Sequence, residues 1–284
     1  MNELISANEL ATLLRRRSDV VVFDIRYSLG DVGQGRKMYQ EGHLPGAFFL
    51  DILDDLSGPL GPGTGRHPLP DPLLLAEKLR RCGVSNTTHV IAYDDSSCMF
   101  AARLWWLLRW MGHDQVSILD GGIRNWKASG GQVTTEMPIV MRPGNFTPNL
   151  QNELLLSADE LEALLKNDGM TLVDARAPER FRGDVEPIDP VAGHIPGAVN
   201  FPFARNFDSQ GFFLPTKQLA ELHSSYVPTT NGNARNVIHM CGSGVTGCVN
   251  SLAAATAGLG MGRLYAGSWS QWITDPKRPI ARGD

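Results

Sequence analysis

Two stretches of the chain carry apolar residues at helical spacing directly after a serine that is followed three positions later by glutamate. The first begins at Ser6 in I-S-A-N-E-L-A-T-L-L, and the second begins at Ser157 in L-S-A-D-E-L-E-A-L-L. Such a pair forms a capping box, in which each side chain accepts the other residue's backbone N–H. The pattern therefore predicts an amphipathic helix after each serine.

A short apolar run rich in β-branched residues follows each predicted helix. The runs are V-V-V-F-D-I-R, ending at Arg26, and T-L-V-D-A-R, ending at Arg176. Continuous apolar runs of this length are typical of parallel strands that are buried on both faces. Each run closes on an acid and an arginine two positions apart, which we interpret as a structural ion pair at the strand end.

The order of these blocks is the same in both halves of the chain, which indicates an internal duplication. Three further pairs of blocks match: G-H-L-P-G-A with G-H-I-P-G-A (from Gly42 and Gly193), H-V-I-A-Y-D-D with N-V-I-H-M-C-G (from His89 and Asn236), and D-G-G-I-R-N-W with A-G-S-W-S-Q-W (ending at Trp126 and Trp272). The duplication predicts two α/β domains in tandem, each a parallel β-sheet flanked by helices on both faces.

The predicted domains cover residues 1–138 and 153–284. Residues 139–152, which overlap the stretch M-P-I-V-M-R-P-G-N-F-T-P-N (137–149), are expected to form a linker because this stretch is rich in proline and asparagine. A length of 284 residues suits two domains of ordinary size.

Composition narrows the class of protein. With 42% hydrophobic and 20% charged residues, a packed globular chain is expected. A net charge of −4 without a long basic run argues against nucleic acid or an anionic membrane as partner. The first residues do not resemble a secretory signal, and no apolar run reaches membrane-spanning length. Four cysteines without a C-x-x-C motif indicate a reducing compartment, so a cytoplasmic protein is expected.

The two halves differ at the end of one matched strand. Alignment of V-I-A-Y with V-I-H-M places Asp94 opposite Cys241. Only the second half continues with C-G-S-G-V-T-G, so only this half carries a nucleophile followed by glycines. Since ligands of open α/β sheets bind beyond the carboxyl ends of the strands, Cys241 is the candidate catalytic residue.

The residues after Cys241 predict a cradle of backbone amides. They are small and uncharged: Gly242, Ser243, Gly244, Val245, Thr246 and Gly247. Glycines permit unusual backbone angles, so that successive amides, with those of the helix that follows, converge on an anion. A thiol in this position should have a lowered pKa. The alternatives are a structural turn around a buried cysteine and, for Thr246, simple capping of the helix.

With these motifs the chain resembles the tandem-domain rhodanese sulfurtransferases over nearly its whole length. The family's D-x-R and G-H-x-P-G-A motifs occur twice and the active loop C-G-S-G-V-T once. The resemblance implies a catalytically silent N-terminal domain, with Asp94 in the place of the cysteine. It also implies that Cys241 takes sulfane sulfur from a donor as a persulfide and passes it to a thiol or to cyanide. No metal-ligand spacing is present, and no metal or other cofactor is expected.

The resemblance also bears on the sulfur donor. Within the family, C-R-K-G-V-T loops go with thiosulfate and neutral C-G-S-G-V-T loops go with 3-mercaptopyruvate. Residues 242–247 carry no charge, so 3-mercaptopyruvate is the expected donor. Thiosulfate with cyanide as acceptor is one alternative, and a sulfur-carrier module that delivers persulfide to a partner protein is another. A thioredoxin-like reductant is a further candidate partner.

By the same resemblance, Arg180 occupies the position of an arginine that clamps the donor carboxylate. Arg182 follows two residues later and is a candidate for the second arm, because Ile188 stands where a second arginine is usual. A surface salt bridge is the alternative interpretation for both arginines.

The first half carries an element, L-D-I-L-D-D-L-S…G-R-H-P-L-P, that resembles the family's acidic-plus-histidine element. It supplies His67 and Asp51 as candidates for a proton relay with Ser243. Leu53 stands where a second acid is usual, and Asp54 is the alternative acid. Exposed loop charge is the other interpretation of this element.

Overall fold

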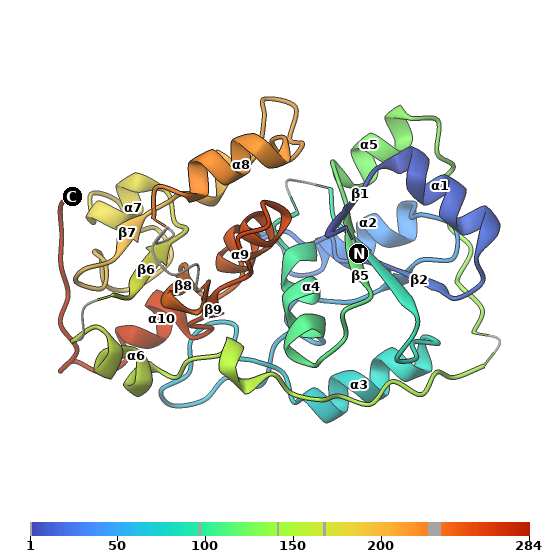
Figure 1. Ribbon diagram of the computed structural model, residues 1–284. Coiled ribbons are helices and arrows are strands. Elements are labelled where there is room, and N and C mark those ends of the chain that lie inside the picture. Colours follow the sequence, from blue (N-terminus) through green and yellow to red (C-terminus); the bar gives the residue numbers. More distant parts are fainter. Residues whose placement is uncertain (1, 96–97, 141, 167–168, 227–233) are drawn as a thin grey trace. The chain divides into compact units, whose positions relative to one another are not determined.

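The computed structural model describes residues 2–95, 98–140, 142–166, 169–226 and 234–284. These residues form two compact units, each built on one parallel sheet with helices on its faces (Figure 1). Unit 1 comprises Met1–Gly58, Pro70–Gln151 and Phe207–Phe213, and unit 2 comprises Pro59–Leu69, Asn152–Asn206 and Leu214–Asp284. Two short segments therefore belong to the unit that does not contain their neighbours in the sequence.

Unit 1 has a five-stranded sheet in the order β1-β5-β4-β2-β3, with all pairs parallel. Its elements in chain order are β1 (Leu4–Ile5), α1 (Ala7–Arg16), β2 (Val20–Asp24), α2 (Gln34–Glu41), β3 (Phe48–Phe49), α3 (Pro72–Arg81), β4 (His89–Tyr93), α4 (Ala101–Trp110), β5 (Val116–Leu119) and α5 (Gly122–Ala128).

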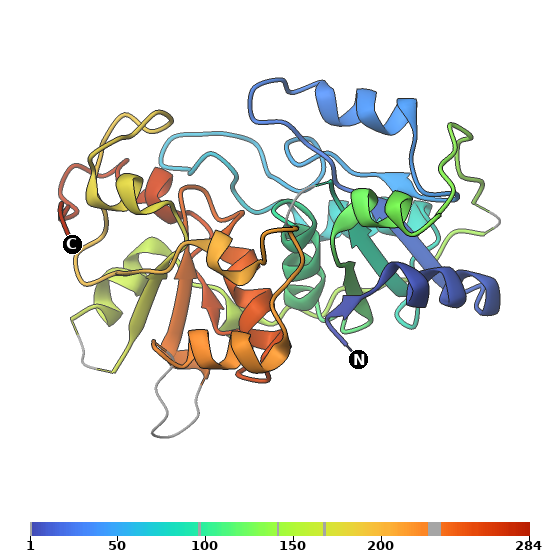
Figure 2. The ribbon, with the colours of Figure 1, turned by 90° about the horizontal axis from the view of Figure 1, so that it is seen from above.

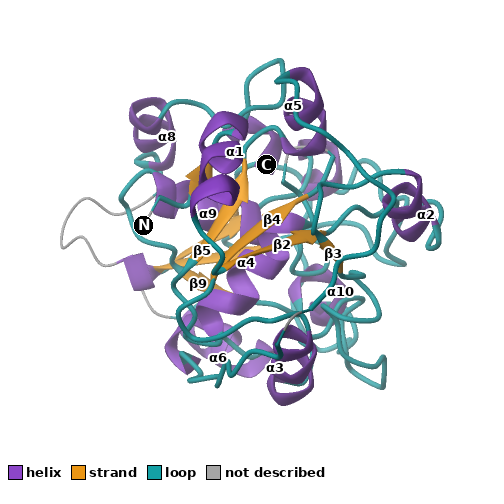
Figure 3. Ribbon diagram, turned by 90° about the vertical axis from the view of Figure 1, so that its right-hand side faces the viewer, coloured by secondary structure: helices purple, strands orange, loops and turns teal. Residues whose placement is uncertain are grey.

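Helices cover both faces of the sheet in unit 1. One face, with Val22 and Ile91, packs against Leu10 of α1 and Trp126 of α5. Helix α4, which is buried on almost every side, packs against β4 and β5. Figure 3 shows α1 and α5 on one side of these strands and α3 on the other. The alternation of side chains along each strand produces the two cores.

Unit 2 has a four-stranded parallel sheet in the order β7-β6-β8-β9 (Figure 2). Its elements in chain order are η1 (Asn152–Leu154), α6 (Ala158–Leu164), β6 (Thr171–Asp174), α7 (Pro178–Arg182), β7 (Val199–Asn200), η2 (Phe203–Asn206), α8 (Thr216–His223), η3 (Ala234–Asn236), β8 (Val237–Met240), α9 (Gly247–Thr256), β9 (Arg263–Leu264) and α10 (Ser268–Trp272).

The sheet of unit 2 also has a core on each face. Ile238 and Met240 of β8 pack with Leu161 of α6 and Trp269 of α10. The opposite face packs with α8 and α9, and in Figure 1 α8 lies on the other side of the strands from α6 and α10. Trp269 and its neighbour in α10, Trp272, are buried in the first of these cores. The predicted α/β class with two parallel sheets is confirmed.

The local signals in the sequence reappear in both units. Ser6 and Ser157 each form a complete capping box with the glutamate three residues later. The first matched strands end at Asp24 and Asp174, two residues before the arginines that close the predicted runs. Residues 139–140 and 142–151, within the predicted linker, belong to unit 1, where the amide of Asn149 donates to the carbonyl of Met111 at 2.9 Å. Among the helices described, none has the length and apolar composition to cross a membrane.

Candidate active site

Cys241 follows the last residue of β8 and precedes a loop that leads into α9. The loop crosses the start of α10 closely: the amide of Trp269 donates to the carbonyl of Cys241 at 3.1 Å, and the amide of Ser270 donates to that of Gly242 at 2.9 Å. Gly244 has a φ of +80°, and a Cβ atom there would lie 2.1 Å from the carbonyl oxygen of Ala266. Only glycine fits this position, so local geometry dictates the residue.

Backbone amides of the loop surround the thiol. The amide of Gly244 donates to Sγ of Cys241 at 3.1 Å, and the amide of Ser243 donates to it at 3.4 Å. Cys241 is only 2% exposed. Two N–H groups that converge on one sulfur form a nest for an anion, as predicted from the glycines.

The balance of burial and hydrogen bonding favours the thiolate. Burial has the largest influence on the Cys241 thiol, and by itself it raises the pKa because it removes the charged form from water. The hydroxyl of Thr246 and the amides of Ser243 and Gly247 stabilise the charged form and together outweigh burial. The pKa of Cys241 therefore lies below its usual range, which favours the thiolate, the form of cysteine that acts as a nucleophile.

The side chain of Thr246 interacts with the sulfur of Cys241 and does not cap α9. It occupies the N-cap position of α9, but its side chain makes no capping hydrogen bond. Its hydroxyl stabilises the thiolate of Cys241 instead. The interpretation of Thr246 as a helix cap is thus wrong, because the rotamer that reaches the sulfur leaves the helix amides without its oxygen.

Substitution Thr246→Val should raise the pKa of Cys241, since it removes the hydroxyl donor and keeps the side-chain shape. In the wild type, alkylation of Cys241 by iodoacetamide should speed up with pH only up to the lowered pKa and then stay constant. In the variant, we expect this rise to shift to higher pH by about one unit. Mass spectrometry of the alkylated peptide at a series of pH values measures both profiles.

Cys82 provides an internal reference for that experiment. Burial, the main cause, raises the pKa of Cys82 to about 11, so this thiol should react only at strongly alkaline pH in both proteins. Identical Cys241 profiles in the wild type and the Thr246→Val variant would contradict the role given to the hydroxyl.

His67 and Ser243 are brought together, although 176 positions separate them in the sequence. Nδ1 of His67 and Oγ of Ser243 are hydrogen bonded at 2.8 Å, and both residues are buried. The segment Pro59–Leu69, which carries His67, belongs to unit 2. A histidine and a hydroxyl at this distance can exchange a proton.

Asp51 belongs to unit 1, where its carboxylate closes a turn. Oδ1 of Asp51 accepts the amide N–H of Leu53 at 2.8 Å and that of Asp54 at 3.2 Å. The turn gives the Asp51 carboxylate a structural role, and membership of Asp51 in a relay with His67 stays a prediction.

Arg180 lies in a cluster of alternating charges beside the loop. Its Nε and Nη2 atoms donate to Glu186, with the shortest contact at 2.8 Å, and Nη2 also contacts Asp189 at 3.2 Å. Asp189 is paired in turn with Arg66. Arg66 was not predicted as a site residue, although it directly precedes the candidate His67 in the sequence G-R-H-P.

Arg182 has different surroundings. Its Nε donates to Asp184 at 2.8 Å, with side-chain exposures of 35% and 54%. This contact matches the alternative interpretation of Arg182 as part of a surface salt bridge. Ile188, at the position of the usual second arginine, is also exposed.

The acid–x–arginine pairs have the same geometry in both units. Arg26 contacts Asp24 at 2.6 Å and donates to the carbonyl of Gly42, and Arg176 repeats this with Asp174 at 2.6 Å and Gly193. Each pair fastens the strand end to the G-H-x-P-G-A loop. Because the half without Cys241 has the same pair, we interpret the pair as structural.

Asp94 takes the position of Cys241 in unit 1. Its Oδ2 atom accepts the amide N–H of Phe100 at 2.8 Å and that of Ala101 at 3.1 Å, at the start of α4. Ser96 and Ser97 of this loop lie outside the described residues. A carboxylate from the chain therefore occupies the helix start that faces sulfur in the other unit.

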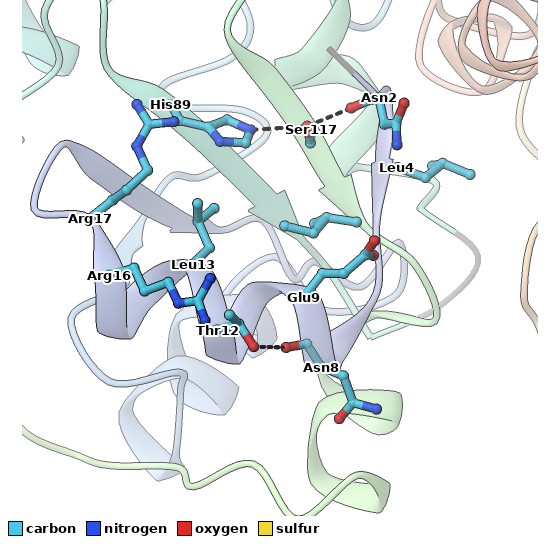
Figure 4. A pocket seen from close by; sticks show the side chains of 11 residues that line it. Asn2, Leu4, Asn8, Glu9, Thr12, Leu13, Arg16, Arg17, His89 and Ser117 are labelled. Atoms are coloured by element: carbon cyan, nitrogen blue, oxygen red, sulfur yellow. Dashed lines mark hydrogen bonds between the residues drawn. The ribbon is translucent and has the colours of Figure 1, made fainter.

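Unit 1 also has a groove of about 620 Å³ between α1 and the sheet (Figure 4). Nε2 of His89 and the hydroxyl of Ser117 are hydrogen bonded at 3.0 Å there, and burial lowers the pKa of His89 to about 4. Glu9 is bound to Ser6 in the capping box. No cysteine lines the groove, so it offers no sulfur nucleophile.

Comparisons with known proteins cover nearly the whole chain. The family described as "Rhodanese-like domain" matches residues 6–129 and 157–275. A "probable 3-mercaptopyruvate sulfurtransferase" of Pseudomonas aeruginosa is 49% identical over 285 residues, with 99% of both chains covered. A "putative thiosulfate sulfurtransferase" of Mycobacterium tuberculosis is 41% identical, with 99% of this chain and 97% of the relative covered. The structure of SseA from Escherichia coli, described as a 3-mercaptopyruvate sulfotransferase, matches with a TM-score of 0.80 and 30% identity over 95% of this chain and 100% of that chain.

Proposed function

The chain belongs to the rhodanese family and is a sulfurtransferase, and on this premise we propose that it moves sulfane sulfur from 3-mercaptopyruvate to a thiol or cyanide through a persulfide on Cys241. The observation that carries the proposal is the buried Sγ of Cys241, which accepts two loop amides in a loop without charged side chains. The same amides can hold the terminal sulfur of a persulfide, which is also an anion.

Two displacements at sulfur complete the proposed reaction. In the first, the Cys241 thiolate attacks the donor's sulfur; the S–S bond forms, the donor's C–S bond breaks, and its electron pair leaves as pyruvate enolate. In the second, the acceptor attacks the outer sulfur, and the electrons of the S–S bond return to Cys241 as thiolate. No net oxidation of the protein occurs, as expected for ping-pong covalent catalysis.

The enolate needs a proton, and the Ser243–His67 pair is the proposed source. The hydrogen bond between Ser243 Oγ and His67 Nδ1 lets the hydroxyl give a proton to the enolate while the imidazole supplies the replacement. Thiosulfate releases sulfite, which needs no such carbon protonation. The pair therefore supports 3-mercaptopyruvate as donor.

Intact-mass measurement after incubation with each donor tests the proposal. We expect the wild type to gain one sulfur atom, about 32 Da, on Cys241, and a reductant to remove it. We also expect a higher kcat/KM with 3-mercaptopyruvate than with thiosulfate. Failure of both donors to load Cys241 would refute persulfide catalysis, and a higher kcat/KM with thiosulfate would make thiosulfate the donor.

Thiosulfate is the second candidate donor, favoured by the name of the mycobacterial relative. A sulfur carrier that serves only a partner protein would load Cys241 but show no turnover with small acceptors. We place the reaction in the cytoplasm, because none of the four cysteines forms a disulfide in the part of the chain that the structure describes. Thioredoxin-like reductants, which carry thiols, are among the acceptors that we propose.

A further inference from the structure

Two guanidinium groups border the first glycine after Cys241. A Cβ atom on Gly242 would lie 2.9 Å from Nη2 of Arg66, and 3.5 Å and 3.6 Å from Nη2 and Nη1 of Arg180. All of these residues belong to unit 2. The missing side chain at position 242 thus makes room for two cations next to the sulfur-carrying loop.

One carboxylate holds both cations. Oδ1 of Asp189 pairs with Nη1 of Arg66, and Oδ2 of Asp189 contacts Nη2 of Arg180 at 3.2 Å. The side chain of Asp189 is 2% exposed, and its backbone amide donates to Glu186 at 3.0 Å. Asp189 is therefore a fixed bridge that turns the two guanidinium planes in defined directions.

Several guanidinium donors remain unused. Nε and Nη2 of Arg66 and Nη1 of Arg180 donate no hydrogen bond within the part of the chain that the structure describes. The side chain of Arg66 is 31% exposed and that of Arg180 is 17% exposed, so water or a ligand can reach them. Unused N–H groups of two guanidiniums suit the two oxygens of a carboxylate.

We propose that Arg66 and Arg180 together bind the carboxylate of the donor, and that Asp189 is the residue that positions both and selects the donor by charge. The inference rests on the proposed function and deepens it, because it names the second arm of the donor site. Arg66 takes the place that the sequence suggested for Arg182. Arg66 lies in the segment Pro59–Leu69, which also contains His67, so one segment positions a residue for donor binding and a residue for proton transfer.

The charges of the cluster explain the selection. Arg66, Arg176 and Arg180 face Asp174, Asp189 and Glu186, so three positive charges meet three negative ones. A neutral cluster offers hydrogen bonds without excess positive charge. Beside a thiolate, such a site tolerates a monoanionic 2-oxo acid better than the dianion thiosulfate.

The test begins with Arg66→Gln. We expect its KM for 3-mercaptopyruvate to rise about 10- to 100-fold, while kcat at saturation stays within about threefold of the wild type. Arg66→Lys keeps the charge but loses the planar fork, so its KM should rise by a smaller factor. Arg205→Gln is the matched control: Arg205 is exposed and lies over the ring of Phe201, so its KM should not change.

Pyruvate provides a readout that does not depend on turnover. As a 2-oxo acid without sulfur, it should protect Cys241 of the wild type from iodoacetamide. In Arg66→Gln, half-maximal protection should need about 10-fold or more pyruvate. Circular dichroism and thermal unfolding establish whether the variants are folded. If Arg66→Gln does not fold, the same measurements on Arg66→Lys test the role of Arg66.

Asp189→Asn tests the selection by charge. The amide keeps the shape of the side chain but leaves one positive charge without a partner. We expect the ratio of kcat/KM for thiosulfate to that for 3-mercaptopyruvate to rise at least about fivefold. An unchanged or lower ratio would refute the role of Asp189.

The outcomes separate this inference from the proposed function. If the wild type loads sulfur from 3-mercaptopyruvate but Arg66→Gln has unchanged KM and unchanged pyruvate protection, the role of Arg66 is refuted and the function stands. If neither donor loads the wild type, the proposed function fails, and the pyruvate protection of wild type and Arg66→Gln still decides whether Arg66 binds a carboxylate.

Discussion

Cys241→Ser should lose sulfur transfer from every donor, with turnover lower by at least about 10,000-fold. A hydroxyl at this position is not ionised near neutrality and cannot store sulfane sulfur as a persulfide. The amides of Ser243 and Gly244 would still be in place, so the loss reports on the sulfur alone. Steady-state turnover and intact mass after donor treatment measure the effect, and the variant should gain no mass.

Cys82→Ser is the matched control for this variant. Cys82 lies at the C-terminal end of α3 in unit 1, and burial raises its pKa to about 11. The Cys82→Ser variant should therefore keep both sulfur loading on Cys241 and wild-type turnover. Sulfur gain by Cys241→Ser would show that another residue carries the sulfur and that the mechanism is wrong.

Gly244→Ala should reduce turnover by about 100- to 1,000-fold, the usual cost of losing one donor to a developing anion. A Cβ atom would lie 2.1 Å from the carbonyl oxygen of Ala266 and 2.9 Å from its carbonyl carbon. Both are backbone atoms, so the loop has to move, and the Gly244 amide moves away from the Cys241 sulfur. Turnover, the pH profile of Cys241 alkylation and the midpoint of thermal unfolding measure the result.

Gly46→Ala separates the clash from the cost of the backbone angle. Gly46 has a φ of +77°, close to that of Gly244, but a Cβ atom there would meet nothing within 4 Å. This variant should lose only about 1–2 kcal/mol of stability and keep its turnover. If Gly244→Ala behaves like Gly46→Ala, the close approach to Ala266 does not hold the amide cradle in place.

Much of the fold could be predicted because its signals are local. The capping boxes at Ser6 and Ser157, each contained within four residues, predict the helices that follow them. The apolar runs that include Asp24 and Asp174 predict the strands. The position of Cys241 at a strand end followed from comparing the two halves. The repeat made this comparison possible, because a residue that occurs in both halves does not distinguish the half with the nucleophile from the other.

The charged part of the site could not be predicted in the same way. Arg66 and Asp189 are 123 positions apart, and no local pattern shows that one carboxylate holds two arginines. The choice of Thr246 between helix amides and sulfur depends on one side-chain torsion, for which the sequence has no signal. Pairings of distant side chains are set by packing, and they decide which arginine faces the donor.

The carboxylate of Asp94 has a consequence for any change of function in the half that lacks Cys241. Its Oδ2 atom accepts the amides of Phe100 and Ala101 at the start of α4, and the sequence D-D-S-S-C-M-F from Asp94 to Phe100 contains none of the glycines that follow Cys241. A single codon change to cysteine at position 94 would therefore not rebuild the sulfur cradle, because the loop and its glycines would have to change as well. A second sulfur site in this half would therefore need a new loop as well as a new nucleophile.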